Sequence, residues 1–107
     1  MKNELATARQ IIADNFSQAG YKVETIYLFG SRAKNTASAN SDWDFFVVLE
    51  KDIDRYERSN IILQIKRKLS ALKIPNDIIA QSKSQVDIDK DNLGRITYYA
   101  LKEGVPV

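Results

Sequence analysis

Residues 28–50 read LFGSRAKNTASANSDWDFFVVLE, and this stretch decides the fold. The residues that lead into it, 23–29 (VETIYLF), are rich in β-branched and aromatic types and predict a strand that ends at Gly30. Residues 44–49 (DFFVVL) form a near-continuous apolar run, which is typical of a strand buried on both faces. Residues 31–41 lack large apolar side chains, so we expect a loop that opens with one helical turn at Ser31.

Three helices are expected around these strands, since apolar residues recur at three- and four-residue steps and then stop at a helix breaker. The first helix is expected over residues 4–19, before Gly20, and the last over residues 92–103, before Gly104. The middle helix is expected to run to residue 72, before Pro75, and to be capped at its start by Asp52 or Asp54. The side chains expected to face inward are Leu5, Ala8, Ile12, Phe16, Ile61, Ile65, Leu69, Leu72, Leu93, Ile96, Ala100 and Leu101.

A short third strand is expected at residues 77–80, followed by a polar, acidic stretch at 84–91. The predicted order is therefore αββαβα, an α/β (α+β) fold with a small mixed β-sheet covered by helices. With 107 residues, the chain is expected to form a single domain, residues 1–107.

The composition excludes several classes of function. Sixteen Lys and Arg against fourteen Asp and Glu give a net charge of +2, too small to predict direct nucleic-acid binding. No apolar run is long enough for a membrane span and the amino end is polar, so a cytoplasmic protein is expected. The chain has no Cys and no His, which excludes disulfides, thiolate or imidazole metal sites and Ser-His-Asp catalysis. Any chemistry must come from carboxylates, hydroxyls, Lys or Arg, together with a hard cation.

Two carboxylates stand at the start of the second strand. Because side chains alternate along a strand, Asp42 and Asp44 project from one face while Trp43, a core residue, points to the other. Two such close carboxylates repel each other unless a cation lies between them. Mg²⁺ suits them, since it prefers one or two carboxylates plus phosphate oxygens.

The end of the first strand suits a phosphate. Gly30 allows the backbone to approach a ligand closely, and free N–H groups at a turn beginning at Ser31 would form an anion site. Arg32 and Lys34 add positive charge on the same loop. If the two strands are neighbours, a phosphate-binding turn lies beside a metal-binding carboxylate pair, as a nucleoside triphosphate with Mg²⁺ requires.

The stretch resembles the Gly-Ser-x₁₀-Asp-x-Asp signature of the minimal nucleotidyltransferases, within the DNA polymerase β-like superfamily. The resemblance covers nearly the whole chain, and it implies that Gly30 and Ser31 hold nucleotide phosphates while Asp42 and Asp44 bind Mg²⁺. It also implies a third carboxylate on a later strand, matched here by Asp77, that completes the metal site and acts as a base. Family members often have glycine at position 35, where this chain has an asparagine, which also tolerates a left-handed backbone.

Asp77 has a rival for the third position. Asp87 and Asp89 also show strand-like spacing, but a helix was expected directly after them, where aspartates serve as caps and first-turn charges. Asp77 opens an apolar strand just after Pro75, so Asp77 is the preferred third ligand.

The first functional hypothesis is transfer of AMP from ATP to a hydroxyl, with two Mg²⁺ ions at the aspartates. A catalytic core without a second domain favours a protein acceptor. The resemblance points the same way, because small members are commonly antitoxins of HEPN–MNT toxin–antitoxin pairs and can add AMP to a tyrosine of the HEPN ribonuclease. A HEPN-type toxin is thus the expected partner.

Two alternatives are kept. One is a non-catalytic antitoxin that masks its toxin by binding, and the other is nucleotidyl transfer to a small molecule such as an aminoglycoside, with a dimer partner replacing the missing domain. The sequence leaves open the acceptor, the nucleotide base, the choice between Mg²⁺ and Mn²⁺, and the oligomeric state, including an oligomer with the partner.

Overall fold

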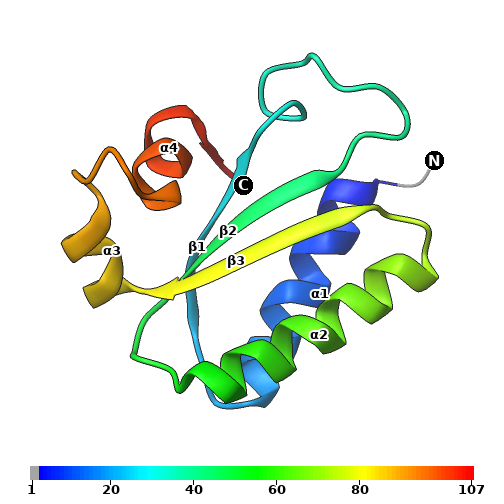
Figure 1. Ribbon diagram of the computed structural model, residues 1–107. Helices are drawn as coiled ribbons and strands as arrows, with labels where there is room; N and C mark the ends of the chain where they lie inside the picture. Colours follow the sequence, from blue (N-terminus) through cyan, green and yellow to red (C-terminus); the bar gives the residue numbers. More distant parts are fainter. Residues whose placement is uncertain (1–2) are drawn as a thin grey trace.

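A mixed sheet forms the centre of the computed structural model, which describes residues 3–107 (Figure 1). Within these residues the sheet has four strands in the order β3-β2-β1-β4. The elements are α1 (Glu4–Gln18), β1 (Val23–Phe29), β2 (Trp43–Leu49), α2 (Arg55–Ala71), β3 (Asn76–Ser82), α3 (Lys83–Asp89), α4 (Ile96–Glu103) and β4 (Val105–Pro106). Strand β1 runs antiparallel to β2 and β4, whereas β2 and β3 are parallel. The predicted mixed sheet of an α+β fold is confirmed.

Local capping explains where the two long helices begin. The side chain of Asn3 accepts a hydrogen bond from the amide of Ala6 (3.0 Å) at the start of α1. The carboxylate of Asp54 accepts from the amides of Tyr56 (3.0 Å) and Glu57 (3.1 Å) at the start of α2. Of the two aspartates expected as caps for α2, Asp54 is therefore the one that caps it.

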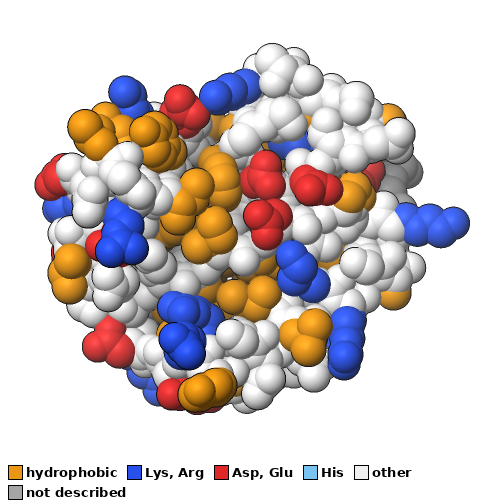
Figure 2. Space-filling model, viewed as in Figure 1, with side chains coloured by type: hydrophobic (Ala, Val, Ile, Leu, Met, Phe, Trp, Pro, Cys, Tyr) orange, Lys and Arg blue, Asp and Glu red, His pale blue; other side chains and the backbone are white. Residues whose placement is uncertain are grey.

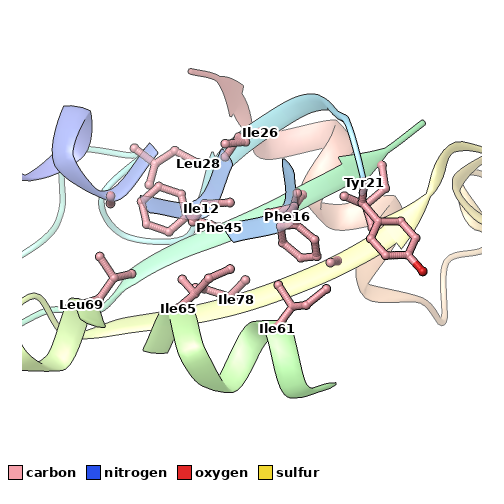
Figure 3. Close-up of a cluster of buried hydrophobic side chains, with 14 of the residues drawn as sticks. Ile12, Phe16, Tyr21, Ile26, Leu28, Phe45, Ile61, Ile65, Leu69 and Ile78 are labelled. Atoms are coloured by element: carbon pink, nitrogen blue, oxygen red, sulfur yellow. The ribbon is translucent and has the colours of Figure 1, made fainter. Parts of the chain in front are cut away.

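The main core lies between α1, α2 and one face of the sheet (Figure 3). The apolar stripes of both helices pack against the side chains that β1, β2 and β3 direct to this face. The residues that are completely buried here are Ala8, Ile12, Phe16, Phe45, Val47, Leu49, Ile65 and Leu69. Burial of this size is the main source of stability for a small domain, at about 25 cal/mol per Å² of apolar surface.

A smaller cluster covers the other face of the sheet, beneath α3 and α4. It consists of Phe46, Val48, Val86 and Ala100, with four half-buried side chains packed against it, Tyr27, Phe29, Ile79 and Leu101. Because α3 and α4 are short, they cover only part of this face (Figure 1).

The polar stretch expected at 84–91 contains most of a helix, α3 (residues 83–89), which is absent from the predicted order αββαβα. Ser82 caps the helix by accepting a hydrogen bond from the amide of Gln85 (3.2 Å). Val86 is the only apolar side chain that α3 buries, so the helix carries no apolar stripe for sequence periodicity to detect.

The last helix begins at Ile96, not at residue 92. The side chain of Asn92 accepts from the amide of Gly94 (3.0 Å), and its carbonyl accepts from the amide of Arg95 (3.0 Å), so these residues form a turn instead. The prediction that Leu93 and Ile96 face inward was also wrong, since they are 64% and 43% exposed.

The chain then returns to the sheet as β4, an element that was not predicted. It pairs with Tyr27 and Leu28 of β1, and the amide of Val107 donates to the carbonyl of Ile26 (2.9 Å). Throughout residues 3–107, no helix is long and apolar enough to cross a membrane.

Candidate functional site

Strand pairing brings the two halves of the Gly-Ser/Asp-x-Asp pattern together. In the register of the sheet, Phe29 pairs with Asp44 across β1 and β2, and Asp44 pairs with Asp77 across β2 and β3. Residues paired in this way project from the same face. Asp44 and Asp77 therefore share the face that α3 and α4 only partly cover, directly beside Gly30.

Gly30 lies against the carboxylate of Asp44. Its φ is +74°, a left-handed conformation that glycine adopts without strain. A Cβ atom at this position would clash with Oδ2 of Asp44 and lie only 3.2 Å from its Cγ. Position 30 therefore requires glycine for two reasons: the left-handed backbone conformation, and the space that the Asp44 carboxylate fills.

The loop after Gly30 opens with the tight turn expected at Ser31. The amides of Ala33 and Lys34 donate to the carbonyl of Gly30 (3.2 and 3.3 Å), and the amide of Thr36 donates to the carbonyl of Ser31 (3.1 Å). Asn35 has φ +57°, which confirms the expected left-handed backbone at this asparagine.

The electrostatics of the site centre on Asp44. Burial raises the pKa of its carboxyl, and the nearby charges of Asp77 and then Asp42 raise the pKa further. The charges of Asp77 and Asp42 therefore disfavour the ionised form of Asp44. Figure 2 shows acidic side chains gathered beside hydrophobic surface near the middle of this face.

Asp77 also has a partner of opposite charge. Its carboxylate lies 3.5 Å from Nζ of Lys66, which reaches it from α2. Within residues 3–107, no three Asp, Glu, His or Cys side chains are grouped so that they could hold a metal ion together. The ion pair with Lys66 offsets part of the repulsion between Asp77 and the neighbouring carboxylate of Asp44.

The rival carboxylates lie elsewhere. Asp87 and Asp89 belong to α3, which follows the opposite end of β3 from Asp77. Asp87 lies 3.8 Å from Nζ of Lys90, and the buried Asp89 accepts a hydrogen bond from the side chain of Gln85 (2.9 Å). The structure thus brings Asp77, and not these two residues, beside Asp44.

The basic residues of the loop have partners within the chain. The guanidinium carbon of Arg32 lies 4.4 Å from the centre of the Trp43 ring, and Nη2 donates to the carbonyl of Ser41 (3.0 Å). Lys34 forms an ion pair with Glu103 of α4 (2.9 Å). A phosphate contact by Arg32 stays a prediction.

A protein surface with this geometry suits an anionic substrate that carries a cation. Asp42 and Asp44 supply the oxygen ligands that Mg²⁺ prefers, and Mg²⁺ needs only one or two carboxylates when phosphate oxygens complete its shell. A family model described as polymerase beta, nucleotidyltransferase matches residues 10–104, a range that includes this site. The chain belongs to this nucleotidyltransferase family.

Several solved structures have a similar fold. A mutant MntA toxin–antitoxin complex superimposes with a TM-score of 0.61 at 20% identity, over 98% of this chain and 72% of that one. A toxin–antitoxin structure with AMP-PNP gives 0.57 at 22% identity, over 98% and 72%. A tri-AMPylated HEPN toxin in complex with its MNT antitoxin, from Shewanella oneidensis, gives 0.54 at 18% identity, over 97% and 71%. No functionally curated protein matches the sequence.

One residue of this nucleotidyltransferase site was missed at the level of sequence. Lys66 belongs to the basic end of α2, which is indistinguishable in sequence from a solvated helix face. Its ion pair depends on β3 lying beside α2, and no local pattern could have revealed it.

Proposed function

We propose that this chain transfers AMP from ATP to a hydroxyl group of a protein partner, most specifically a tyrosine of a HEPN-type toxin, and thereby acts as its antitoxin. The observation that carries the proposal is the contact between Gly30 and the carboxylate of Asp44, with Asp77 next in register. The proposed phosphate-binding turn at Gly30 thus lies beside the proposed cation-binding carboxylate of Asp44.

The related structures support the choice of ATP as the donor and of a HEPN-type toxin as the partner. One toxin–antitoxin structure contains AMP-PNP, and another pairs a tri-AMPylated HEPN toxin with an MNT antitoxin. Because their identities are 22% and 18%, they support the choice of acceptor and donor for this chain without determining it.

The residues would divide the work as follows. Gly30 and Ser31 would receive the triphosphate, with the Ser31 hydroxyl as a hydrogen-bond donor to a phosphate oxygen. Asp42 and Asp44 would hold one or two Mg²⁺ ions, whose chemistry when bound is to neutralise the triphosphate and acidify the attacking hydroxyl. Asp77 would accept the proton of that hydroxyl.

In the reaction, the hydroxyl oxygen attacks the α-phosphorus of ATP and forms the new P–O bond. The bond between the α-phosphorus and the bridging oxygen breaks, and pyrophosphate leaves with that electron pair. Catalysis of this kind depends on positioning and charge neutralisation, and no imidazole is needed.

The test is to incubate the protein with Mg²⁺, ATP labelled in the α-phosphate, and a HEPN-type toxin as the candidate partner. Label should move to the partner, and Asp44→Asn should reduce the rate by at least about 100-fold. Asp77→Asn should also reduce it, whereas Asp87→Asn on α3 is the matched control and should leave it unchanged.

Three outcomes would contradict the proposal. No label on the partner, or equal labelling by Asp44→Asn, would exclude the transfer. A toxin that is neutralised equally well by the double variant Asp42→Asn, Asp44→Asn would indicate masking instead. Label that moves to an aminoglycoside with no protein partner present would indicate a small-molecule acceptor.

A further inference from the structure

The loop of residues 31–42 joins the glycine turn to the carboxylates, and Arg32 connects its two ends. Arg32 follows Ser31 directly, while its contacts lie at the far end of the loop. Its Nη2 donates to the carbonyl of Ser41 (3.0 Å) and, at longer range, to the carbonyl of Ala39 (3.4 Å). The guanidinium also lies over the ring of Trp43, 4.4 Å from its centre.

Trp43 anchors these contacts from behind the site. As the residue between Asp42 and Asp44, it points to the opposite face of the sheet and packs against the main core. Its ring is stacked nearly parallel on that of Phe45, with centres 6.4 Å apart and planes 8° apart. A side chain in this place cannot touch a ligand that binds at the carboxylates.

From these contacts we propose that Arg32 is a positioning residue, which together with Trp43 (the Arg32–Trp43 pair) fixes Gly30-Ser31 relative to Asp42 and Asp44. The proposal rests on the proposed nucleotidyl transfer, because positioning matters only if the two ends of the loop bind one substrate. It assigns Arg32 a role different from the phosphate contact that its place in the sequence suggests.

The burial of the Nε atom of Arg32 favours this role. Nε of Arg32 and Nε1 of Trp43 are both buried without a hydrogen-bond partner in the described part of the chain. A guanidinium committed to a ring and to backbone carbonyls on its own loop is not free to follow a phosphate. Arginine suits this arrangement because its planar group can stack and donate at the same time, which a lysine ammonium cannot do.

A phosphate contact and a positioning role predict different effects of replacing Arg32 with lysine. If Arg32 contacted phosphate, Arg32→Lys would keep the charge and mainly raise the KM for ATP. As a positioning residue, Arg32→Lys should lower kcat by about 10- to 100-fold with a smaller change in KM, because misplacement by about 1 Å can cost that much. Trp43→Leu should reproduce this loss, whereas Trp43→Phe keeps an aromatic face and should restore part of the rate.

The decisive experiment measures the loop without any substrate. Hydrogen–deuterium exchange of the amides of residues 33–41 should become at least about 10-fold faster in Arg32→Lys and in Trp43→Leu. The effects should not add in the double variant, because both substitutions remove the same contact. Arg67→Lys, on the exposed side of α2, is the matched control and should change neither exchange nor kcat.

The outcomes separate the two proposals. Unchanged loop exchange in Arg32→Lys together with a normal kcat would overturn the positioning role and leave the proposed function intact. Additive effects of Arg32→Lys and Trp43→Leu would overturn it as well. Failure of the unaltered chain to transfer AMP would refute the proposed function itself. Circular dichroism and Trp43→Phe distinguish a loosened loop from a chain that no longer folds.

Discussion

Replacing Gly30 with alanine tests the contact on which the candidate site depends. At φ +74°, any residue with a Cβ pays about 1–2 kcal/mol for the left-handed conformation. The new Cβ would also clash with Oδ2 of Asp44, which must rotate away from its preferred position at a cost of about 0.5–1.5 kcal/mol. We therefore expect Gly30→Ala to lower the free energy of unfolding by about 1.5–3.5 kcal/mol.

Gly20 provides a matched control. It also has a positive φ, +92°, but a Cβ there would meet nothing within 4 Å. Gly20→Ala should therefore cost only the backbone contribution of about 1–2 kcal/mol. Urea denaturation of both variants without divalent ions measures the difference between them, which is the cost of displacing the Asp44 carboxylate.

A double-mutant cycle makes the test stricter. In an Asp44→Ala background the carboxylate is absent, so Gly30→Ala should cost no more than Gly20→Ala. AMP transfer should fall by about 100-fold in Gly30→Ala and stay near normal in Gly20→Ala, because only the first moves a proposed ligand. Equal costs for the two glycine variants, with no coupling between positions 30 and 44, would refute the reasoning.

Three further predictions concern single contacts, and urea denaturation checks each. Asp44→Asn without divalent ions should raise the free energy of unfolding at pH 7 by about 0.5 kcal/mol. Because the pKa of Asp44 is raised in the folded protein, its ionised form costs stability above that pKa, so the gain should fade as the pH falls through it; a gain that grows at acid pH would contradict this. Thr97→Val should cost about 1–2 kcal/mol, because the buried hydroxyl donates to the side-chain carbonyl of Gln81 (2.8 Å), and Thr97→Ser should cost less. Lys66→Met should cost less than about 1 kcal/mol, since its ion pair with Asp77 is exposed, and the cost should disappear at high salt.

The parts of the fold with strong local signals were predictable from the sequence. The stripe of Ile61, Ile65 and Leu69 predicts α2, and the run DFFVVL predicts β2, since both patterns follow the period of their own element. The spacing predicted a carboxylate pair beside the glycine turn on the condition that the two strands are neighbours, which the pairing of β1 with β2 fulfils for Asp44. Pairing across the sheet then places Asp44 beside both Gly30 and Asp77.

The parts that depend on distant contacts were not predictable. Strand β4 has only two residues, and it exists because the end of the chain passes along the edge of β1. Leu93 and Ile96 continue a helical pattern, but the side chain of Asn92 binds the following backbone and begins a turn, which delays α4 and leaves both residues exposed. Lys66 beside Asp77 likewise requires the packing of α2 on β3.

The positive φ angles of the described residues have two different explanations. Gly20 and Lys73 have positive φ, but each ends a helix whose last carbonyls accept hydrogen bonds from the residues that follow, as in an ordinary helix terminus. The same pattern explains Asn35, because the amide of Thr36 donates to the carbonyl of Ser31 (3.1 Å) across it, so among the described residues only Gly30 has a positive φ that does not end a helical turn.

Two unfavourable features therefore gather between residues 30 and 44: a carboxyl with a raised pKa, and a buried guanidinium nitrogen that has no hydrogen-bond partner in the described part of the chain. Proteins keep such local conflicts mainly where function requires them. If the segment exists to hold a triphosphate and its cation, relieving the conflict and removing the function should coincide. Neutralising Asp44 should then stabilise the chain while abolishing transfer, whereas crowding the same carboxylate from Gly30 should lower both stability and transfer.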